Sequence, residues 1–148
     1  MSRGRLSSSF WGLPGYIEVM AQVSHTPPPI GPVIAYYDAQ CPICVAEMSR
    51  YARHGEDKIK LVDANGPDLP PDVDRVSALA AMHVRHPDGR VITGWSAFIT
   101  IWDHLPGWGW LASLTRPAVI RLPLDWIYRR LAPYRPRRTC QNGQCTLD

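Results

Sequence analysis

Two cysteines separated by two residues are the part of this sequence best suited to chemistry. Cys41 and Cys44 directly follow an apolar run at 33–37 and directly precede a helical pattern. Such a pair can alternate between two thiols and one disulfide, and the start of a helix favours a thiolate because unpaired N–H groups and the positive end of the helix dipole lie there. Pro42 suits the first helical position, which makes Cys41 the N-cap. We therefore expect Cys41, exposed at the cap, to be the nucleophile and Cys44, one turn further on, to be the shielded resolving thiol.

Two further side chains are candidates for supporting this pair. Asp38 stands three residues before Cys41, where its carboxylate could relay a proton to or from Cys44. Aspartate is equally common in such turns as a cap of its own backbone, and a carboxylate beside a thiolate opposes ionisation of the thiol. His83 opens a predicted strand and could support the thiolate as an imidazolium, or it could be a half-exposed strand residue without a role in the reaction.

A second cysteine pair, Cys140 and Cys145, lies near the C-terminus. It could exchange with Cys41 and Cys44 as a second dithiol, or it could be a spectator, and of these two we favour the spectator. All four cysteines could instead bind zinc, which takes four ligands and often uses two closely spaced pairs. The position of the first pair, between a strand and a helix, favours redox chemistry over a zinc site.

The elements that must position these residues follow from hydrophobic periodicity and turn residues. The sequence predicts strands at 33–37 and 59–62, helices at 42–53, 73–81 (capped by Asp72) and 94–104, and a hairpin of strands at 82–86 and 91–93. This βαβ–α–ββα order is that of the thioredoxin fold. We therefore predict an α/β, thioredoxin-like three-layer fold with a four-stranded mixed sheet and an appended C-terminal helical segment. The predicted parts are a disordered leader at 1–31, a redox domain at 32–104, a helical extension of that domain at 105–134, and a flexible basic, Cys-containing tail at 135–148.

The C-terminal third of the chain carries most of its tryptophans and a cluster of arginines. We expect one or two helices there, split by Pro117 and Pro123, with the tryptophans in the core and the arginines solvated. The arginines lack interleaved aromatic residues, so we expect no nucleic-acid binding, although weak peripheral membrane contact is possible. No run of about 18 apolar residues is present, so we expect no transmembrane segment, and no signal peptide is visible, which favours a cytoplasmic location.

The motif Asp38-x-x-Cys41-x-x-Cys44 resembles the signature of the DCC family of thiol-disulfide oxidoreductases. Further resemblance lies at 82–84, 87–91 and 94–98, and together these stretches cover roughly 33–131. The resemblance implies a thioredoxin-like fold, protein-disulfide oxidoreductase activity through Cys41 and Cys44, and a functional role for Asp38. The sequence departs from the thioredoxin pattern before His83, where Ala80-Ala81-Met82 stands in place of the usual proline. No flavin, haem or nicotinamide motif is present, so we expect no cofactor, a protein or small-molecule disulfide as substrate, and an external thiol as electron donor.

Overall fold

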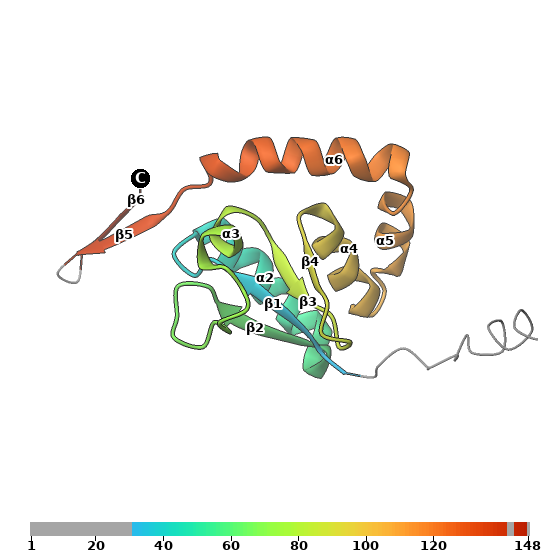
Figure 1. The fold of residues 1–148 in the computed structure, drawn as a ribbon, viewed down its shortest axis with the longest axis horizontal. Helices are drawn as coiled ribbons and strands as arrows, with labels where there is room; N and C mark the ends of the chain where they lie inside the picture. Colours follow the sequence, from blue (N-terminus) through green and yellow to red (C-terminus); the bar gives the residue numbers. More distant parts are fainter. Residues whose placement is uncertain (1–30, 142–143, 148) are drawn as a thin grey trace, which may run out of the picture.

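The computed structural model describes residues 31–141 and 144–147, so the predicted leader lies outside the described residues except for Gly31. Its centre is a four-stranded sheet in the order β2-β1-β3-β4 (Figure 1). β1 (Val33–Tyr37) pairs in parallel with β2 (Ile59–Asp63), whereas β3 (His83–Arg85) pairs antiparallel with both β1 and β4 (Val91–Thr93). The mixed sheet and its strand order confirm the predicted thioredoxin-like α/β fold.

Alternate residues of β1 face two different cores, as the period of a strand requires. Val33 and Ala35 point toward the cluster that also contains residues of the helices α2 (Pro42–Gly55) and α4 (Trp95–His104). Tyr36 points to the opposite face, where Ala78 of α3 (Arg75–Ala80) covers the sheet. Helices cover both faces of the sheet at β1, which agrees with its apolar sequence. The structure therefore has the three predicted layers.

Most predicted boundaries agree with the structure to within two residues, and the cap of α3 is the main exception. Asp74, rather than Asp72, accepts the backbone N–H of Ser77 at 2.8 Å and starts this helix. Asp72 instead pairs with Arg85 on β3 at 2.7 Å. Both aspartates are suitable N-caps, and the ion pair with a neighbouring strand decides between them. A short 3₁₀ turn, Glu56–Lys58, leads from α2 into β2.

The predicted helical extension is present as α5 (Gly109–Thr115), α6 (Ala118–Leu131) and a 3₁₀ turn at Ala132–Tyr134. Pro117 separates α5 from α6 as expected, but the prediction that Pro123 also splits the segment is wrong. Pro123 removes only the hydrogen bond to the carbonyl of Val119, whose residue is 81% exposed, so solvent can replace that bond. No helix among the described residues is long and apolar enough to cross a membrane.

α6 is fastened to the sheet domain at the start of α4. Asp125 of α6 accepts the backbone N–H of Trp95 at 2.7 Å, and the hydroxyl of Tyr128 accepts the N–H of Met82 at 2.7 Å. Gly94, with φ of +68°, makes this approach possible, because a Cβ at that position would collide with Asp125 and Arg129. The extension therefore lies over the edge of the sheet from which β3 and α4 begin.

The outer face of α6 carries apolar side chains with high exposure, including Val119, Leu122 and Trp126. The guanidinium of Arg130 lies over the Trp126 ring, 5.8 Å from its centroid. Weak peripheral membrane contact therefore stays a prediction, now with a defined surface.

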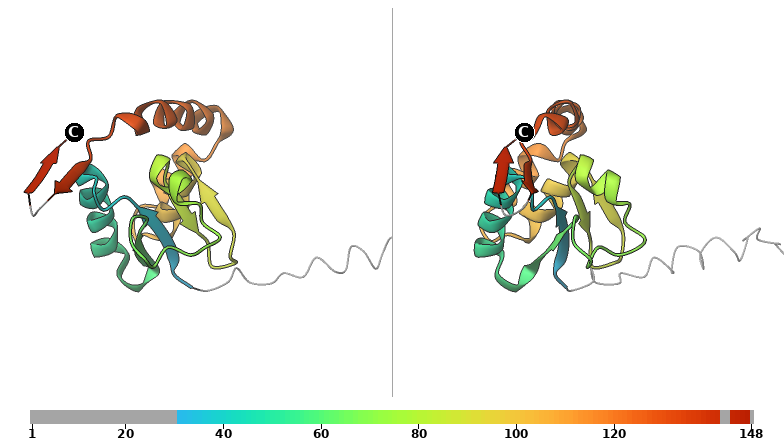
Figure 2. Two further views of the ribbon diagram at one scale, coloured as in Figure 1. Left: turned by 60° about the vertical axis from the view of Figure 1, so that its left-hand side comes forward. Right: turned by 90° about the vertical axis from the view of Figure 1, so that its left-hand side faces the viewer.

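After α6 the chain continues past the start of α2 and forms an antiparallel hairpin of β5 (Arg138–Gln141) and β6 (Gln144–Leu147), which projects away from the sheet domain (Figures 1 and 2). The backbone N–H of Arg138 donates to the carbonyl of Gln40 at 2.8 Å, which joins this segment to the turn before α2. We call residues 135–138 the C-terminal strap. The sequence predicts that the arginines of this segment are solvated, whereas in the structure the strap contacts Gln40 and Asp38.

Candidate active site

The sequence prediction for the start of α2 is confirmed in its backbone geometry. Cys41 is the N-cap with extended backbone, Pro42 is at the first helical position, and Cys41 Sγ accepts the N–H of Cys44 at 3.2 Å. The N–H of Cys41 donates to the carbonyl of Asp38 at 3.1 Å, which closes the turn between β1 and α2. The sulfur of Cys41 therefore lies where a helix N-terminus stabilises negative charge.

The predicted exposure of Cys41 is wrong. Cys41 is 0% exposed, and Cys44, expected to be the shielded thiol, is 7% exposed. The strap lies against the turn that holds Cys41, because the backbone N–H of Arg138 donates to the carbonyl of Gln40. Both cysteines are free thiols in this structure.

Cys44 lies in surroundings that keep it protonated. Burial raises the pKa of Cys44 to about 12, with a further contribution from the neighbouring Cys41 sulfur. The guanidinium of Arg135 lowers the pKa of Cys44 against these two effects, and its Nη1 donates to Cys44 Sγ at 3.5 Å. A thiol that holds its proton in the reduced pair suits the resolving role rather than the attacking one.

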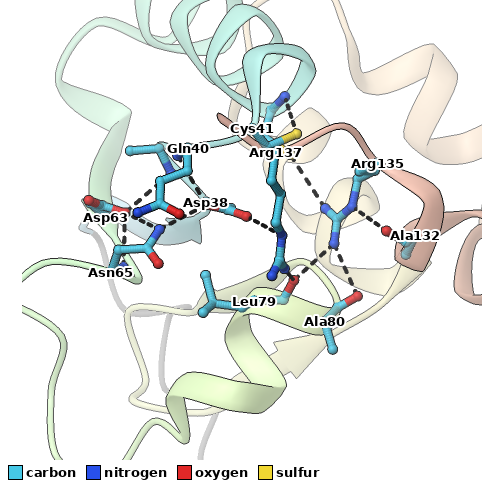
Figure 3. Close-up of polar contacts among 12 residues, drawn as sticks. Asp38, Gln40, Cys41, Asp63, Asn65, Leu79, Ala80, Ala132, Arg135 and Arg137 are labelled. Atoms are coloured by element: carbon cyan, nitrogen blue, oxygen red, sulfur yellow. Dashed lines mark hydrogen bonds and ion pairs between the residues drawn. The ribbon is translucent and has the colours of Figure 1, made fainter. Parts of the chain in front are cut away.

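The carboxylate of Asp38 is buried, with 3% of its side chain exposed, and is engaged on both oxygens (Figure 3). Oδ1 accepts from the N–H of Gln40 at 3.0 Å and from Nδ2 of Asn65 at 2.8 Å. Oδ2 pairs with Nε of Arg137 at 2.9 Å. The contact with Gln40 is the turn-capping arrangement, and the ion pair with Arg137 fastens the strap to the turn before Cys41.

The strap also occupies backbone groups just before β3. Arg135 donates to the carbonyls of Leu79 and Ala80, both at 3.1 Å, and Arg137 donates to Leu79 at 2.8 Å (Figure 3). The hydroxyl of Tyr128 also accepts the N–H of Met82. The segment Ala80-Ala81-Met82, which has no proline, is therefore bonded to both α6 and the strap.

His83 is not brought to the cysteine pair by any contact in the described structure. Its Nδ1 is 2.9 Å from the carbonyl of Ala81, and its Nε2 is 3.0 Å from Oγ of Ser77. Because a carbonyl only accepts, Nδ1 is the donor in the first contact, and both ring nitrogens are engaged away from the cysteines. The residue is 6% exposed rather than half-exposed, and it joins β3 to α3.

A cavity of about 260 Å³ opens beside Cys44. Its walls are mainly aromatic and aliphatic, and the side chains nearest the chemistry are those of Cys44, Glu47 and Arg135, with Trp95, Trp102 and Tyr128 among the aromatic ones. Burial raises the pKa of Glu47, and the Tyr51 hydroxyl donates to its Oε1 at 2.7 Å. Cys44 lines this cavity in the described conformation, whereas Cys41 does not.

The second cysteine pair is described only in its backbone. Cys140 and Cys145 are directly opposite each other in the register of β5 and β6, and their side chains lie outside the described part of the structure. Within the described residues, no group of three histidine, cysteine or acidic side chains is arranged to hold a metal ion. The roles of Cys140 and Cys145 as a dithiol, a spectator pair or zinc ligands therefore stay predictions.

Sequence reasoning missed the two arginines that complete the site. The cluster that contains Arg135 and Arg137 is visible in the sequence, but its distance of more than ninety residues from the cysteines gives no sign of contact. The charge of Asp38 is the one indication in the sequence, because a carboxylate that becomes buried beside the C-x-x-C pair needs a cation as its partner.

Comparison with known proteins agrees with the geometry. The model of the DCC1-like thiol-disulfide oxidoreductase family matches residues 35–141, which include Asp38, both cysteines of the pair, α6 and the strap. Searches of curated proteins and of solved structures found no match. The match spans well over half of the chain, so this protein belongs to the DCC1-like thiol-disulfide oxidoreductase family.

Proposed function

We propose that this protein exchanges disulfides through Cys41 and Cys44, with Cys41 as the nucleophile and Cys44 as the resolving thiol. The observation that carries the proposal is the asymmetry of the two sulfurs. Cys41 Sγ accepts an N–H at the helix N-terminus, whereas burial raises the pKa of Cys44 to about 12. This asymmetry supports Cys41 as the attacking sulfur and Cys44 as the thiol that keeps its proton until the resolution step.

The reaction has two steps. The Cys41 thiolate attacks one sulfur of a substrate disulfide, the substrate S–S bond breaks, and the other substrate sulfur leaves as a thiolate that takes up a proton. Cys44 then loses its proton and attacks Cys41 Sγ, which forms the Cys41–Cys44 disulfide and releases the second substrate thiol. The substrate gains two electrons and the cysteine pair loses two. An external thiol supplies them again, and we place this cycle in the cytoplasm, where such thiol systems operate.

The burial of Cys41 adds a condition to the first step. Because Cys41 is fully buried and the strap is paired with the turn before it, we infer that a substrate sulfur reaches Cys41 Sγ after the strap has moved away from this turn. The strap is held there by the ion pair between Arg137 and Asp38 and by the hydrogen bond from Arg138 to Gln40. We infer that attack proceeds from an open conformation of the strap and that the described conformation is the closed one.

Trapping of the mixed disulfide tests the proposed roles. Full-length Cys44→Ser protein is treated with a neutral small disulfide such as 2-hydroxyethyl disulfide, and the adduct is located by intact mass and peptide mapping. We expect a stable adduct on Cys41, and none on Cys44 in the Cys41→Ser protein. An adduct that forms only in the Cys41→Ser protein would reverse the assignment, and the absence of an adduct in both would exclude exchange with this disulfide.

A further inference from the structure

The guanidinium of Arg135 is held beside the Cys44 sulfur by backbone carbonyls. Its Nε donates to Ala132 at 2.8 Å, and its Nη2 donates to Leu79 and Ala80, both at 3.1 Å (Figure 3). The other amino group, Nη1, donates to Cys44 Sγ at 3.5 Å. Three carbonyls from two separate segments therefore fix a planar cation, and one corner of that cation contacts a reacting sulfur.

We propose that Arg135 is a catalytic residue of the resolution step, where it stabilises the Cys44 thiolate that attacks the mixed disulfide. This inference rests on the exchange reaction proposed above and identifies a group that the reaction uses. Arginine suits the role because its charge does not titrate and its planar fork can be held by several acceptors at once. A charge that is already oriented needs no reorganisation when the thiolate forms.

The balance of charges around Cys44 changes during the reaction in a way that favours this role. In the reduced pair, burial and the neighbouring Cys41 sulfur raise the pKa of Cys44, and Arg135 lowers it. Once Cys41 is joined to a substrate, its sulfur is neutral and no longer opposes a charge on Cys44. The guanidinium remains in place, so its effect on Cys44 is greatest in the step that requires the Cys44 thiolate.

In that step Cys44 releases its proton to solvent through the adjoining cavity, and its thiolate attacks Cys41 Sγ. The Cys41–Cys44 bond forms while the bond between Cys41 and the substrate sulfur breaks. The substrate leaves as a thiolate and takes up a proton, so protons and electrons balance. Arg135 keeps its own protons throughout and acts only through its charge and its hydrogen bond.

The test measures attack and resolution separately in the full-length protein. Reduced protein is mixed with 2-hydroxyethyl disulfide and quenched with acid at intervals. Intact mass then distinguishes free thiols, mixed disulfide and internal disulfide, and peptide mapping separates the Cys41–Cys44 disulfide from one between Cys140 and Cys145. The variants are Arg135→Gln, which removes the charge, and Arg135→Lys, which keeps it. Arg116→Gln is the matched control, because Arg116 is 58% exposed and pairs with Asp103 on α4, away from the strap.

We expect resolution in Arg135→Gln to slow by about threefold or more, since an opposite charge near a thiol shifts its pKa by one unit or more and the higher nucleophilicity of the more basic thiolate offsets part of the lost ionisation. Its rate profile should move to higher pH and mixed disulfide should accumulate, while attack by Cys41 is as fast as in the wild type or faster because the strap is looser. Arg135→Lys should recover part of the rate, and Arg116→Gln should match the wild type.

Equal resolution rates and pH profiles in folded Arg135→Gln and wild-type protein would overturn the role of Arg135. If Arg135→Gln does not melt cooperatively, Arg135→Lys decides the question, because a lysine lacks the fork that three carbonyls hold. Its resolution should then be slower than in the wild type while attack is not, and unchanged resolution would overturn the proposal. The Cys44→Ser protein reports attack alone, so failure of the exchange reaction itself is recognised by the absence of its Cys41 adduct.

Discussion

The closed strap predicts that loss of the Arg137–Asp38 ion pair makes Cys41 more reactive. Arg137→Gln removes this 2.9 Å contact and weakens the 2.8 Å hydrogen bond to Leu79, but it leaves the cysteines and their helix unchanged. Asp38 is buried, whereas the side chain of Arg137 is 47% exposed, so solvent replaces part of what is lost. We therefore expect the closed strap to lose about 1–1.5 kcal/mol relative to the open one.

This free energy converts directly into a rate. If Cys41 reacts only from the open conformation, a loss of about 1.4 kcal/mol raises the open population and the alkylation rate about tenfold. The assay is alkylation by iodoacetamide in a Cys44→Ser background, and peptide mapping follows Cys41 separately from Cys140 and Cys145. Asp38→Asn breaks the same ion pair from the other side and should give a similar acceleration.

The double variant makes the prediction specific. Because each substitution removes the same contact, Arg137→Gln combined with Asp38→Asn should accelerate alkylation little more than either substitution alone. Unchanged rates in both single variants would refute the closed strap. A slower rate in Asp38→Asn, with Arg137→Gln unaffected, would also contradict it, because both substitutions remove the same contact.

Three further predictions concern Cys44, Gly94 and the second cysteine pair. Since burial is the largest effect that raises the pKa of Cys44 and it does not depend on Cys41, alkylation of Cys44 in Cys41→Ser protein should be at least about tenfold slower than that of free cysteine at pH 8 and should still rise above pH 10, and a plateau near pH 8 would contradict this. Gly94→Ala should lower the free energy of unfolding by about 2–4 kcal/mol in denaturant titrations, because it introduces a Cβ at φ of +68° against Asp125 and Arg129, and an unchanged midpoint would exclude this packing of α6. Joint replacement of Cys140 and Cys145 by serine should leave turnover of small disulfides unchanged if they are spectators, and lost turnover with a thiol donor would indicate a second dithiol.

The parts of the fold that depend on local pattern could be predicted from the sequence. The apolar run of β1, the proline after Cys41 and the Asp88-Gly89 turn each specify their own element, and the βαβ–α–ββα order of the elements indicates a mixed sheet of four strands. The cap of α3 could not be assigned, because Asp72 and Asp74 are equally good caps until the position of Arg85 is known.

The incomplete part of the site prediction has one physical cause. The burial of Cys41 and the contacts of Arg135 and Arg137 depend on where α6 directs the chain, and that direction is set by Asp125 and Tyr128 bonding to the start of α4 and β3. Periodicity and spacing carry no information about such distant contacts. His83 shows the converse, because its position in the sequence favours the site whereas its hydrogen bonds lie with Ser77 and Ala81.

The most direct test of the account is a redox titration of the full-length protein, purified without chelator, in buffers of defined thiol to disulfide ratio. Free thiols are alkylated after equilibration, and intact mass and peptide mapping identify which cysteines have reacted. The account predicts a reversible two-electron transition in which Cys41 and Cys44 become protected together as one disulfide. Cysteines that stay alkylatable over the whole range, or stoichiometric zinc that requires all four cysteines, would contradict it.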